Sequence, residues 1–302
     1  MKNLKVSAVI PTFNGLELLK KNLPAVLRSL RDGDELVIVD DASNDDSVSY
    51  LKREFKAKAT DKSVIGTEKL VGGFKAASKT ITVVILINKK NQRFGESSNR
   101  GVKAATGDLI FLINNDVSPK KDVLKHLLMH FQPINYLENK QIKIHQQSKI
   151  FAVGCMEIEK LDGKKIYGGK NKLWFEKGLF IHSRADKYTS GKTAWASGGS
   201  AMFDRKKWLE LEGFDKIYYP AYWEDIDLSF RAKKKGWQVL FEEKAVVNHN
   251  HESTNIDVFG QKKLNLMSWR NADKFTMKNG NLWQKVSHLL WKPYWWWKRK
   301  VV

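Results

Sequence analysis

Short apolar runs alternate with amphipathic stretches through the first third of the chain, a pattern typical of strands that alternate with helices. The runs that predict strands are residues 6–10, 36–39, 81–87 and 109–113. The stretches with apolar residues at helical spacing are residues 17–30, 45–55 and 97–106. Parallel strands need long crossover connections, which are usually helices, so this order predicts a parallel sheet with right-handed crossovers.

The pattern is less regular in the rest of the chain. Residues 56–79 are polar and carry a glycine pair, which predicts an insertion before the third strand. Residues 132–149 are also polar and predict a surface excursion. After residue 150, short strands are separated by glycine pairs at 168–169 and 198–199. We therefore expect an α/β fold whose second half is mixed rather than doubly wound.

Polar clusters follow three of the predicted strands, at residues 11–14, 40–43 and 114–116. Asn, Asp and Ser favour turns in any case, so each cluster taken singly is explained as an ordinary turn. Because ligands bind at the carboxyl ends of the strands in an open parallel sheet, three clusters on one edge favour a polar-ligand site. Asp41 could accept hydrogen bonds from a base or a sugar, and Asp116 could hold Mg²⁺ or Mn²⁺ beside a diphosphate. The glycine-rich motifs of dinucleotide-binding dehydrogenases and of P-loop enzymes do not occur, which argues against those two classes.

A second cluster, residues 222–233, predicts a helix that begins at Glu224 or Asp225. Acidic residues in a first turn are favoured by the helix dipole, and this is the first interpretation for each of them. Asp227 lies four residues before Arg231, so we interpret the two as a structural ion pair. The aromatic residues nearby leave Glu224 or Asp225 available as a base in a sugar-like pocket.

Two histidines, His249 and His251, lie two residues apart, so on a strand they face the same side. One of them could complete a metal site with Asp116. A polar strand end with solvated histidines explains the same spacing equally well.

The cysteine content restricts the class of protein. The single Cys155 lies in an apolar stretch and predicts a core thiol. A disulfide scaffold and a cysteine-based zinc module are excluded, and a reduced, cytosolic setting fits. We expect no transmembrane helix, because no stretch of about 18 apolar residues is free of charge. The first residues also lack the long apolar run of a signal peptide.

The charge indicates a phosphate-rich partner. The chain has 302 residues, with 53 Lys and Arg against 33 Asp and Glu, which makes a formal charge of +20. Nucleic acid, an anionic membrane and a phosphorylated small molecule all fit such a charge. Residues 261–302 hold ten of the basic residues, one acidic residue and six of the eleven tryptophans. Tryptophan favours the membrane–water interface and clustered cations favour anionic lipid, so this segment predicts a membrane contact. A helix packed on the rest of the protein is the alternative.

Eight motifs occur in order along the chain: residues 9–15, 39–45, 91–101, 107–116, 198–202, 213–215, 223–228 and 249–251. Each is weak alone, but with the ordered set the chain resembles family 2 glycosyltransferases of the GT-A fold, especially bacterial rhamnosyltransferase-like members. The resemblance covers roughly residues 5–255. It implies a Rossmann-like, mostly parallel central sheet flanked by helices, with a mixed acceptor-side half and a C-terminal helical tail.

The resemblance also implies a division of the chain. Residues 1–260 would form the catalytic domain, with a nucleotide-sugar-binding half at 1–131 and an acceptor-side half at 150–260. Residues 261–302 would form the basic, Trp-rich tail.

Family roles carry over to the matching positions. The residues implied to bind the nucleotide sugar are Pro11, Thr12, Asn14, Asp41, Asn91, Asn99, Gly101, Asn114 and Asn115. The implied ligands of a divalent metal are Asp116 and either His249 or His251. The residues implied to border the acceptor are Gly198, Gly199, Trp223 and Glu224. Asp225 would be the catalytic base, because the family's base is the second acid of its Glu-Asp pair.

The chain departs from the family pattern at three places. Asn114 stands where the family's Asp-x-Asp motif has its first acid, and an amide adds no charge for a metal. Arg93 stands where the family usually has glycine, and its cation could contact the diphosphate or face solvent. The insertion at 56–79 has no clear counterpart.

The resemblance implies an inverting, metal-dependent transfer of a sugar from a UDP- or dTDP-type donor to a glycan or a lipid-linked glycan. The tail would then place the enzyme on the inner face of the cell membrane, in cell-surface polysaccharide synthesis. An inactive nucleotide-sugar or polysaccharide binder of the same fold is the alternative, with Asn114 as a sign of lost activity. Nucleic acid becomes the least favoured partner, because no nucleic-acid-binding motif is present.

Overall fold

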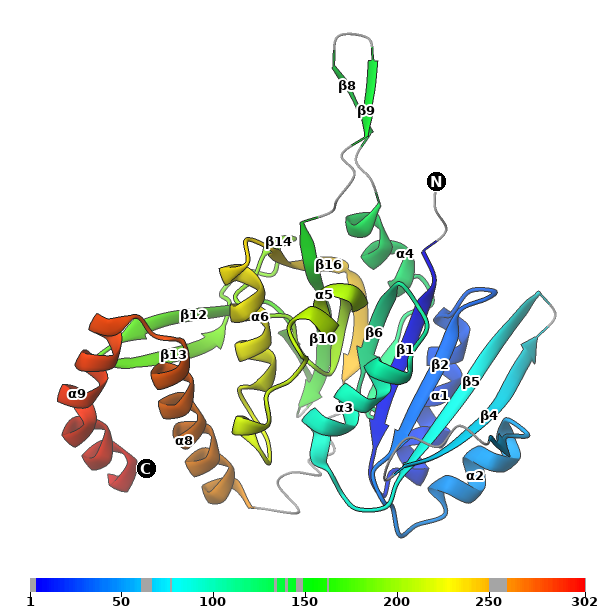
Figure 1. Ribbon diagram of the computed structural model, residues 1–302, viewed down its shortest axis with the longest axis horizontal. Coiled ribbons are helices and arrows are strands. Elements are labelled where there is room, and N and C mark those ends of the chain that lie inside the picture. Colours follow the sequence, from blue (N-terminus) through cyan, green and yellow to red (C-terminus); the bar gives the residue numbers. More distant parts are fainter. Residues whose placement is uncertain are drawn as a thin grey trace.

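The computed structural model describes residues 4–60, 67–76, 78–132, 135–138, 141–144, 149–161, 163–249 and 260–301. One large mixed sheet forms the body of the molecule, and the last two helices of the chain lie together at one end of it (Figure 1). The predicted α/β class with a mostly parallel central sheet is confirmed.

The parallel part of the sheet comes from the first third of the chain. Its strands are β1 (Val6–Thr12), β2 (Glu35–Asp40), β5 (Lys79–Asn88) and β6 (Leu109–Ile113). The helices between them are α1 (Leu16–Ser29), α2 (Ser47–Glu54) and α3 (Arg93–Ala104). β1 pairs in parallel with β2 and β6, and β2 pairs in parallel with β5. These elements confirm the alternation of strand and helix that the apolar pattern predicted.

The helix α3 begins four residues earlier than the apolar spacing predicted, at Arg93 instead of residue 97. The cause is a contact from a distant strand end. The backbone N–H groups of Gln92 and Arg93 each donate to the carboxylate of Asp41, at 2.7 Å. A carboxylate on the first free N–H groups stabilises a helix start.

The polar residues 56–79 form the edge of the sheet as far as they are described. Strand β4 (Thr67–Ala76) pairs with β5 in antiparallel fashion over its whole length, and the short β3 (Lys58–Ala59) pairs with β4. An edge strand has one side without a partner strand, and polar residues there oppose further strand pairing. The predicted insertion is therefore an extension of the sheet.

The second half of the chain adds strands of both directions, as its pattern predicted. They are β7 (Val117–Pro119), β10 (Ile150–Leu161), β11 (Lys164–Gly168), β14 (Gly191–Lys192), β15 (Ser200–Asp204) and β16 (Gln238–His249). The order of strands along the sheet is β14-β16-β10-β15-β6-β1-β2-β5-β4-β3, with β7 beside β16 and β11 beside β10. β15 is antiparallel to β6 and to β10, whereas β10 and β16 are parallel.

The remaining elements lie around this sheet. Two hairpins are formed by β8 (Asn135–Glu138) with β9 (Gln141–Ile144), and by β12 (Asn171–Glu176) with β13 (Leu179–Arg184). The shorter helices are α4 (Val123–Leu128), η1 (Met129–Phe131), α5 (Arg205–Glu210), η2 (Lys216–Tyr218) and α6 (Glu224–Lys234). The β8–β9 hairpin stands away from the body, which agrees with the predicted surface excursion (Figure 1).

Both faces of the sheet are buried. Along β6, the side chains of Leu109, Phe111 and Ile113 belong to one hydrophobic cluster, and those of Ile110 and Leu112 belong to another on the opposite face. This is why the strand reads as a continuous apolar run. Cys155 is buried in the first cluster, as predicted.

Gly101 lies where α3 crosses the sheet. A Cβ atom added to it would lie 2.4 Å from Val9 Cγ1 and 3.0 Å from Val39 Cγ2. The absence of a side chain therefore lets the helix pack closely on β1 and β2. This corrects the prediction that Gly101 lines the donor site, because the residue is buried between helix and sheet.

The predicted C-terminal tail consists of two helices, α8 (Gln261–Asn279) and α9 (Leu282–Val301). Leu264, Ala272 and Phe275 of α8 are buried, and the last two belong to a third hydrophobic cluster with Leu179 and Trp223. Contacts therefore cross the expected boundary at residue 260. Within the described residues, no helix has the length and apolarity needed to span a bilayer.

Candidate functional site

The three predicted polar clusters meet at one edge of the sheet. Thr12, at the end of β1, accepts a hydrogen bond from Asn115 Nδ2 at 2.8 Å. Asn14 contacts the neighbouring cluster, because its side-chain oxygen accepts from the backbone N–H of Asn44 at 2.8 Å. Asn14 is exposed, whereas Pro11 and Thr12 are buried. The predicted convergence of these clusters is therefore present.

Asp41 uses most of its hydrogen-bonding capacity within the protein. It is 4% exposed and accepts from Asn88 Nδ2 at 2.8 Å, in addition to the two N–H groups at the start of α3. A carboxylate has about four acceptor positions, so about one is left for a ligand. Its first role is to connect the ends of β2 and β5 to α3.

Three residues of this edge have left-handed backbone conformations without being glycine. They are Asn14, Ala42 and Arg93, with φ of 47°, 63° and 65°. Each such residue costs on the order of 1 kcal/mol and is found mostly at functional loops. The conformation of Arg93 suits glycine, which explains why a glycine is usual at this family position.

The predicted donor-side asparagines differ in what they contact. Asn91 accepts a hydrogen bond from the backbone N–H of Arg93 at 3.1 Å and stays at the edge. Asn99 donates to the carbonyl of Phe214 and accepts from its N–H, both at 2.8 Å. The amide of Asn99 therefore connects α3 to the loop at Phe214, and its predicted contact with the donor stays a prediction.

The glycine pair 198–199 joins this edge to the predicted base. The Gly199 carbonyl accepts from the Asn114 N–H at 2.9 Å, and a Cβ on Gly199 would lie 2.7 Å from Asn114 Nδ2. The Gly198 N–H donates to Asp225 Oδ2 at 3.2 Å. A side chain at Gly199 would therefore clash with Asn114, and one at Gly198 would press on the rings of Phe94 and Phe214, at 3.1 and 3.2 Å.

Asp116 and His249 come together, as predicted for metal ligands. His249 Nε2 lies 3.4 Å from Asp116 Oδ1, and both side chains are largely buried. Two ligand atoms on one ion, at bond lengths of about 2.1 Å, lie about 3 Å apart or slightly more. The pair therefore fits a divalent ion. His251 lies outside the described residues.

Asp116 Oδ1 is a buried oxygen that accepts no hydrogen bond from the part of the chain that the structure describes. Its neighbour is His249 Nε2 at 3.4 Å, so the oxygen pairs with the imidazolium when His249 is protonated and is open to a metal ion once His249 has lost that proton. Among the described residues, no group of three or more His, Cys, Asp and Glu could hold a metal. A bound ion would thus take further oxygen ligands from water or a diphosphate, as Mg²⁺ commonly does.

Glu157 is a site residue that the sequence analysis missed. Its Oε2 lies 3.9 Å from His249 Nδ1, and its other oxygen accepts from Ser200 Oγ. Burial alone would raise the pKa of Glu157, but the contacts with His249 and Ser200 outweigh it and lower that pKa to about 2. Burial would lower the pKa of His249, yet Asp116 and Glu157 raise it to about 10. The one signal in the sequence that could have pointed to Glu157 is its place directly after the apolar residues 151–156 of β10.

Glu224 and Asp225 form a partly buried acid pair at the start of α6. Burial raises the pKa of Glu224 to about 8, with the charge of Asp225 as the second cause. Burial also raises the pKa of Asp225 to about 6, although the N–H groups of Gly198 and Ile226 oppose this. Glu224 Oε2 accepts no hydrogen bond within the described part of the chain. An acid with a pKa near 6 is suited to accept a proton at neutral pH.

A small pocket beside this pair has a mixed lining. Aromatic residues such as Phe214 and Tyr219 line it together with charged residues such as Arg93, Glu96 and Glu224. The prediction that Trp223 borders an acceptor is corrected, because the side chain is 3% exposed and packs on α8, where its Nε1 donates to Ser268 Oγ at 3.3 Å.

The structural interpretation of Asp227 is confirmed. Asp227 is fully buried and accepts from Arg231 Nε at 2.6 Å.

Comparison with protein families and with known proteins shows what the chain is similar to. The family model described as glycosyl transferase family 2 matches residues 7–208. The O-antigen chain rhamnosyltransferase RfbN of Salmonella typhimurium is 23% identical over 85% of this chain and 69% of its own length. The amylovoran biosynthesis glycosyltransferase AmsB of Erwinia amylovora is 22% identical over 83% of this chain and 71% of its own length.

Two solved structures share the fold. GalNAc-T7 with UDP, GalNAc and Mn²⁺ superposes with a TM-score of 0.58 and 16% identity, over 83% of this chain but only 45% of that one. The mannosyltransferase PcManGT of Pyrobaculum calidifontis, with GDP-Man and Mn²⁺, has a TM-score of 0.55 and 14% identity, over 96% and 74% of the two chains. Our chain thus spans less than half of the first and about three quarters of the second.

We expect the variant Glu224→Gln to remove part of the pH dependence of stability. The raised pKa means that Glu224 stabilises the fold fully below its ordinary value of 4.5 and loses this contribution as pH rises through about 8. Between pH 5 and pH 9, the free energy of unfolding of the wild type should fall relative to the variant by at least about 1 kcal/mol. Urea titrations at both pH values measure this. The exposed Glu54→Gln is the control, and a constant difference between wild type and Glu224→Gln would contradict the expectation.

Proposed function

The chain belongs to glycosyl transferase family 2, with a GT-A fold, and we propose that it is an inverting enzyme of cell-surface polysaccharide synthesis. It would move a sugar from a nucleoside-diphosphate sugar to a saccharide or a lipid-linked acceptor. The observation that carries this proposal is the segment 198–199, which contacts both the Asn114 edge and Asp225. The proposed donor edge and a partly buried acid thus border one site.

Asp225 is the proposed general base. Its raised pKa lets it take the proton of an acceptor hydroxyl as that oxygen attacks the anomeric carbon. The N–H groups of Gly198 and Ile226 hold its two oxygens in place. The nucleoside diphosphate leaves from the opposite face of the sugar, so one displacement inverts the anomeric configuration. No covalent sugar–enzyme intermediate, and hence no carboxylate nucleophile, is needed.

Asp116 and His249 are the proposed ligands of Mg²⁺ or Mn²⁺. Their spacing and the buried Asp116 oxygen fit such an ion. When bound, the ion would neutralise charge on the leaving diphosphate. Asn114 adds no charge, which favours modest affinity. Manganese in the structures of GalNAc-T7 and PcManGT supports a divalent metal within this fold.

The donor would lie along the edge formed by residues 11–14 and 114–116, with a base of the UDP or dTDP type. Nucleotides are bound by the solved proteins of this fold, UDP by GalNAc-T7 and GDP-Man by PcManGT. Asn114 also favours a second candidate, a binder of the same fold without turnover. Donor binding that is never followed by transfer would identify that candidate.

We also propose that α9 contacts an anionic membrane at the inner face of the cell membrane. One side of α9 packs on the protein, where Trp295 Nε1 donates to the Lys177 carbonyl at 2.6 Å. The packed-helix alternative is thus confirmed for that side. The other side exposes large apolar residues: Leu282, Trp283, Val286, Leu289, Leu290, Trp296 and Trp297.

This exposed apolar side has lysines near it. At 100° per residue, these seven positions fall within one arc of about 140°, whereas Trp291, which is 39% exposed, lies outside that arc. Lys285 and Lys292 lie next to that arc. Trp at a membrane interface and Lys near anionic lipid suit this arrangement. In Figure 1, α9 is the outermost helix at one end of the molecule, so a flat surface can reach it.

The variant Asp225→Asn should lose transfer and retain donor binding. A base contributes about 10²- to 10⁴-fold, so the turnover number should fall by about 100-fold or more. A thermal-shift screen of UDP-, dTDP- and GDP-sugars with Mn²⁺ first identifies the donor. The exposed Asp186→Asn is the matched control. Full activity of Asp225→Asn would overturn the assignment of the base.

The variants Asp116→Asn and His249→Gln should each weaken Mn²⁺ binding by about tenfold or more. Electron paramagnetic resonance of free Mn²⁺, with the protein titrated in the presence of nucleoside diphosphate, measures this without turnover. Asp122→Asn on the surface of α4 is the control. Unchanged affinity in both variants would show that the ion binds elsewhere.

The triple variant with Trp283, Leu290 and Trp297 changed to Ser should bind anionic phosphatidylglycerol vesicles at least about tenfold more weakly. The three side chains are exposed by 70%, 71% and 61%, so their loss should leave folding intact. Its control changes Met129, Tyr167 and Leu209, which are exposed on other elements, to Ser. Equal sedimentation of both triple variants with the vesicles would contradict the membrane contact.

A further inference from the structure

Helix α8 lies against the loop that leads into the acid pair. Its side chains at 268, 271, 274 and 278 recur at helical spacing and therefore share one face. All four contact the segment 215–227: Ser268 binds Trp223, Asn271 binds Tyr218, Lys274 donates to the Ile217 carbonyl, and Lys278 binds Asp215 and Asp227. We propose that α8 belongs to the catalytic unit, and that Asn271 and Lys278 are positioning residues for Asp225. This inference rests on the proposed function.

Asn271 holds the backbone just before the acid pair. It is 2% exposed, and the two N–H groups of its Nδ2 are shared among the carbonyls of Tyr218, Ala221 and Tyr222, at 2.9, 2.8 and 3.0 Å. One amide thus closes the turn from η2 to the start of α6. A side chain of this kind fixes the path of the backbone and does not reach a substrate.

The turn needs such support because its backbone is strained. Tyr222 and Trp223 are consecutive non-glycine residues with φ of 73° and 78°. Conformations of this kind persist only when the surrounding structure determines them from several sides. Here Asn271 binds the carbonyl of Tyr222, and Ser268 accepts from the indole of Trp223. Glu224 and Asp225 follow directly, so their placement depends on this turn.

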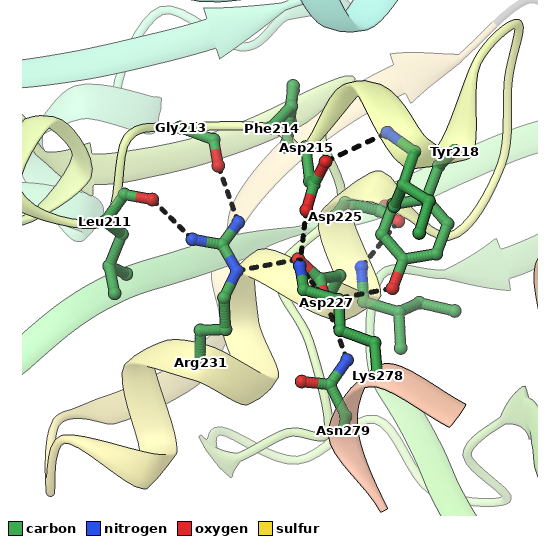
Figure 2. Close-up of polar contacts among 12 residues, drawn as sticks. Leu211, Gly213, Phe214, Asp215, Tyr218, Asp225, Asp227, Arg231, Lys278 and Asn279 are labelled. Carbon is green, nitrogen blue, oxygen red and sulfur yellow. Dashed lines mark hydrogen bonds and ion pairs between the residues drawn. The ribbon is translucent and has the colours of Figure 1, made fainter. Parts of the chain in front are cut away.

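Lys278 contacts helix α6, which carries Asp225, through the side chain of Asp227 (Figure 2). Its Nζ donates to Asp227 at 2.9 Å and to Asp215 at 2.6 Å. Asp227 also accepts from Tyr218 Oη at 2.9 Å and from Asn279 Nδ2 at 2.7 Å, so two of its donors come from α8. Asp227 lies two residues after Asp225 in the first turns of α6. The C-terminal helix thereby fixes both the loop before the base and the helix that carries it.

The first test separates positioning from stability. We expect Asn271→Leu and Lys278→Met to lower kcat tenfold or more, because small displacements of a reacting group are costly. Affinity for the free nucleotides UDP, dTDP and GDP should stay within twofold, since the residues proposed to hold the nucleotide, 11–14 and 114–116, do not belong to the segment 215–227. Lys278→Arg keeps the cation and should restore most of kcat. Lys262→Met, an exposed lysine of α8, and Met277→Leu are matched controls.

A purely structural role of α8 would show a different result. The variants would then have lower melting temperatures, but kcat per folded molecule and its pH profile would equal those of the controls. That result overturns the proposal. If Asn271→Leu does not fold, the comparison of Lys278→Met with Lys278→Arg decides the question by itself.

A second readout needs no turnover. Amide hydrogen exchange of peptides covering 215–227 should become at least tenfold faster in Lys278→Met than in Lys262→Met, with exchange in β1 and β6 unchanged. Unchanged exchange in 215–227 would overturn the proposal that Lys278 holds this segment in place. If the wild type transfers no sugar from any donor, the proposed function fails, whereas exchange still decides whether α8 holds the acid pair.

Discussion

Burying carboxylates is costly unless each is paired or keeps its proton, and the site is organised by how this cost is met. Asp41 and Asp227 are surrounded by donors from several elements, so they serve as anchors of the fold. Glu157 is compensated by a histidine and a serine. Asp225 has two backbone donors and a pKa near 6, whereas Glu224 has the higher pKa of about 8. The degree of compensation thus separates structural acids from those able to exchange a proton.

The donors that compensate these acids come from distant parts of the chain. The N–H groups at the start of α3 satisfy Asp41, and α8 supplies two donors to Asp227. The glycine pair 198–199 lets a single backbone segment reach both Asn114 and Asp225. Strained turns at Arg93 and Tyr222 lie next to these contacts. The edge of the sheet where the polar strand ends meet is therefore held more by tertiary hydrogen bonds than by the local conformational preferences of its residues.

The two C-terminal helices divide their surfaces between two tasks. α8 turns its polar face to the acid-bearing loop, and Phe275 adds to the hydrophobic cluster beneath it. α9 packs through Trp295 and His288 and leaves a broad apolar side exposed. A segment whose composition suggests a simple tail is thus, in its first helix, a structural part of the domain. Five of its six tryptophans belong to the second helix, whereas its lysines are divided equally between the two helices.

The sequence by itself determined the parallel sheet, the three polar strand ends and the acid pair, because apolar periodicity and turn residues are local properties. It also predicted the ion pair of Asp227 with Arg231, whose spacing is fixed by the helix. Only the tertiary structure decided that Gly101 is a packing residue, that Trp223 packs on α8, that Asn99 bonds to the loop at Phe214, and that Glu157 lies next to His249. These roles depend on which distant side chains approach within a few ångströms, and no local pattern contains that information. The position of α8 against the segment 215–227 was decided in the same way.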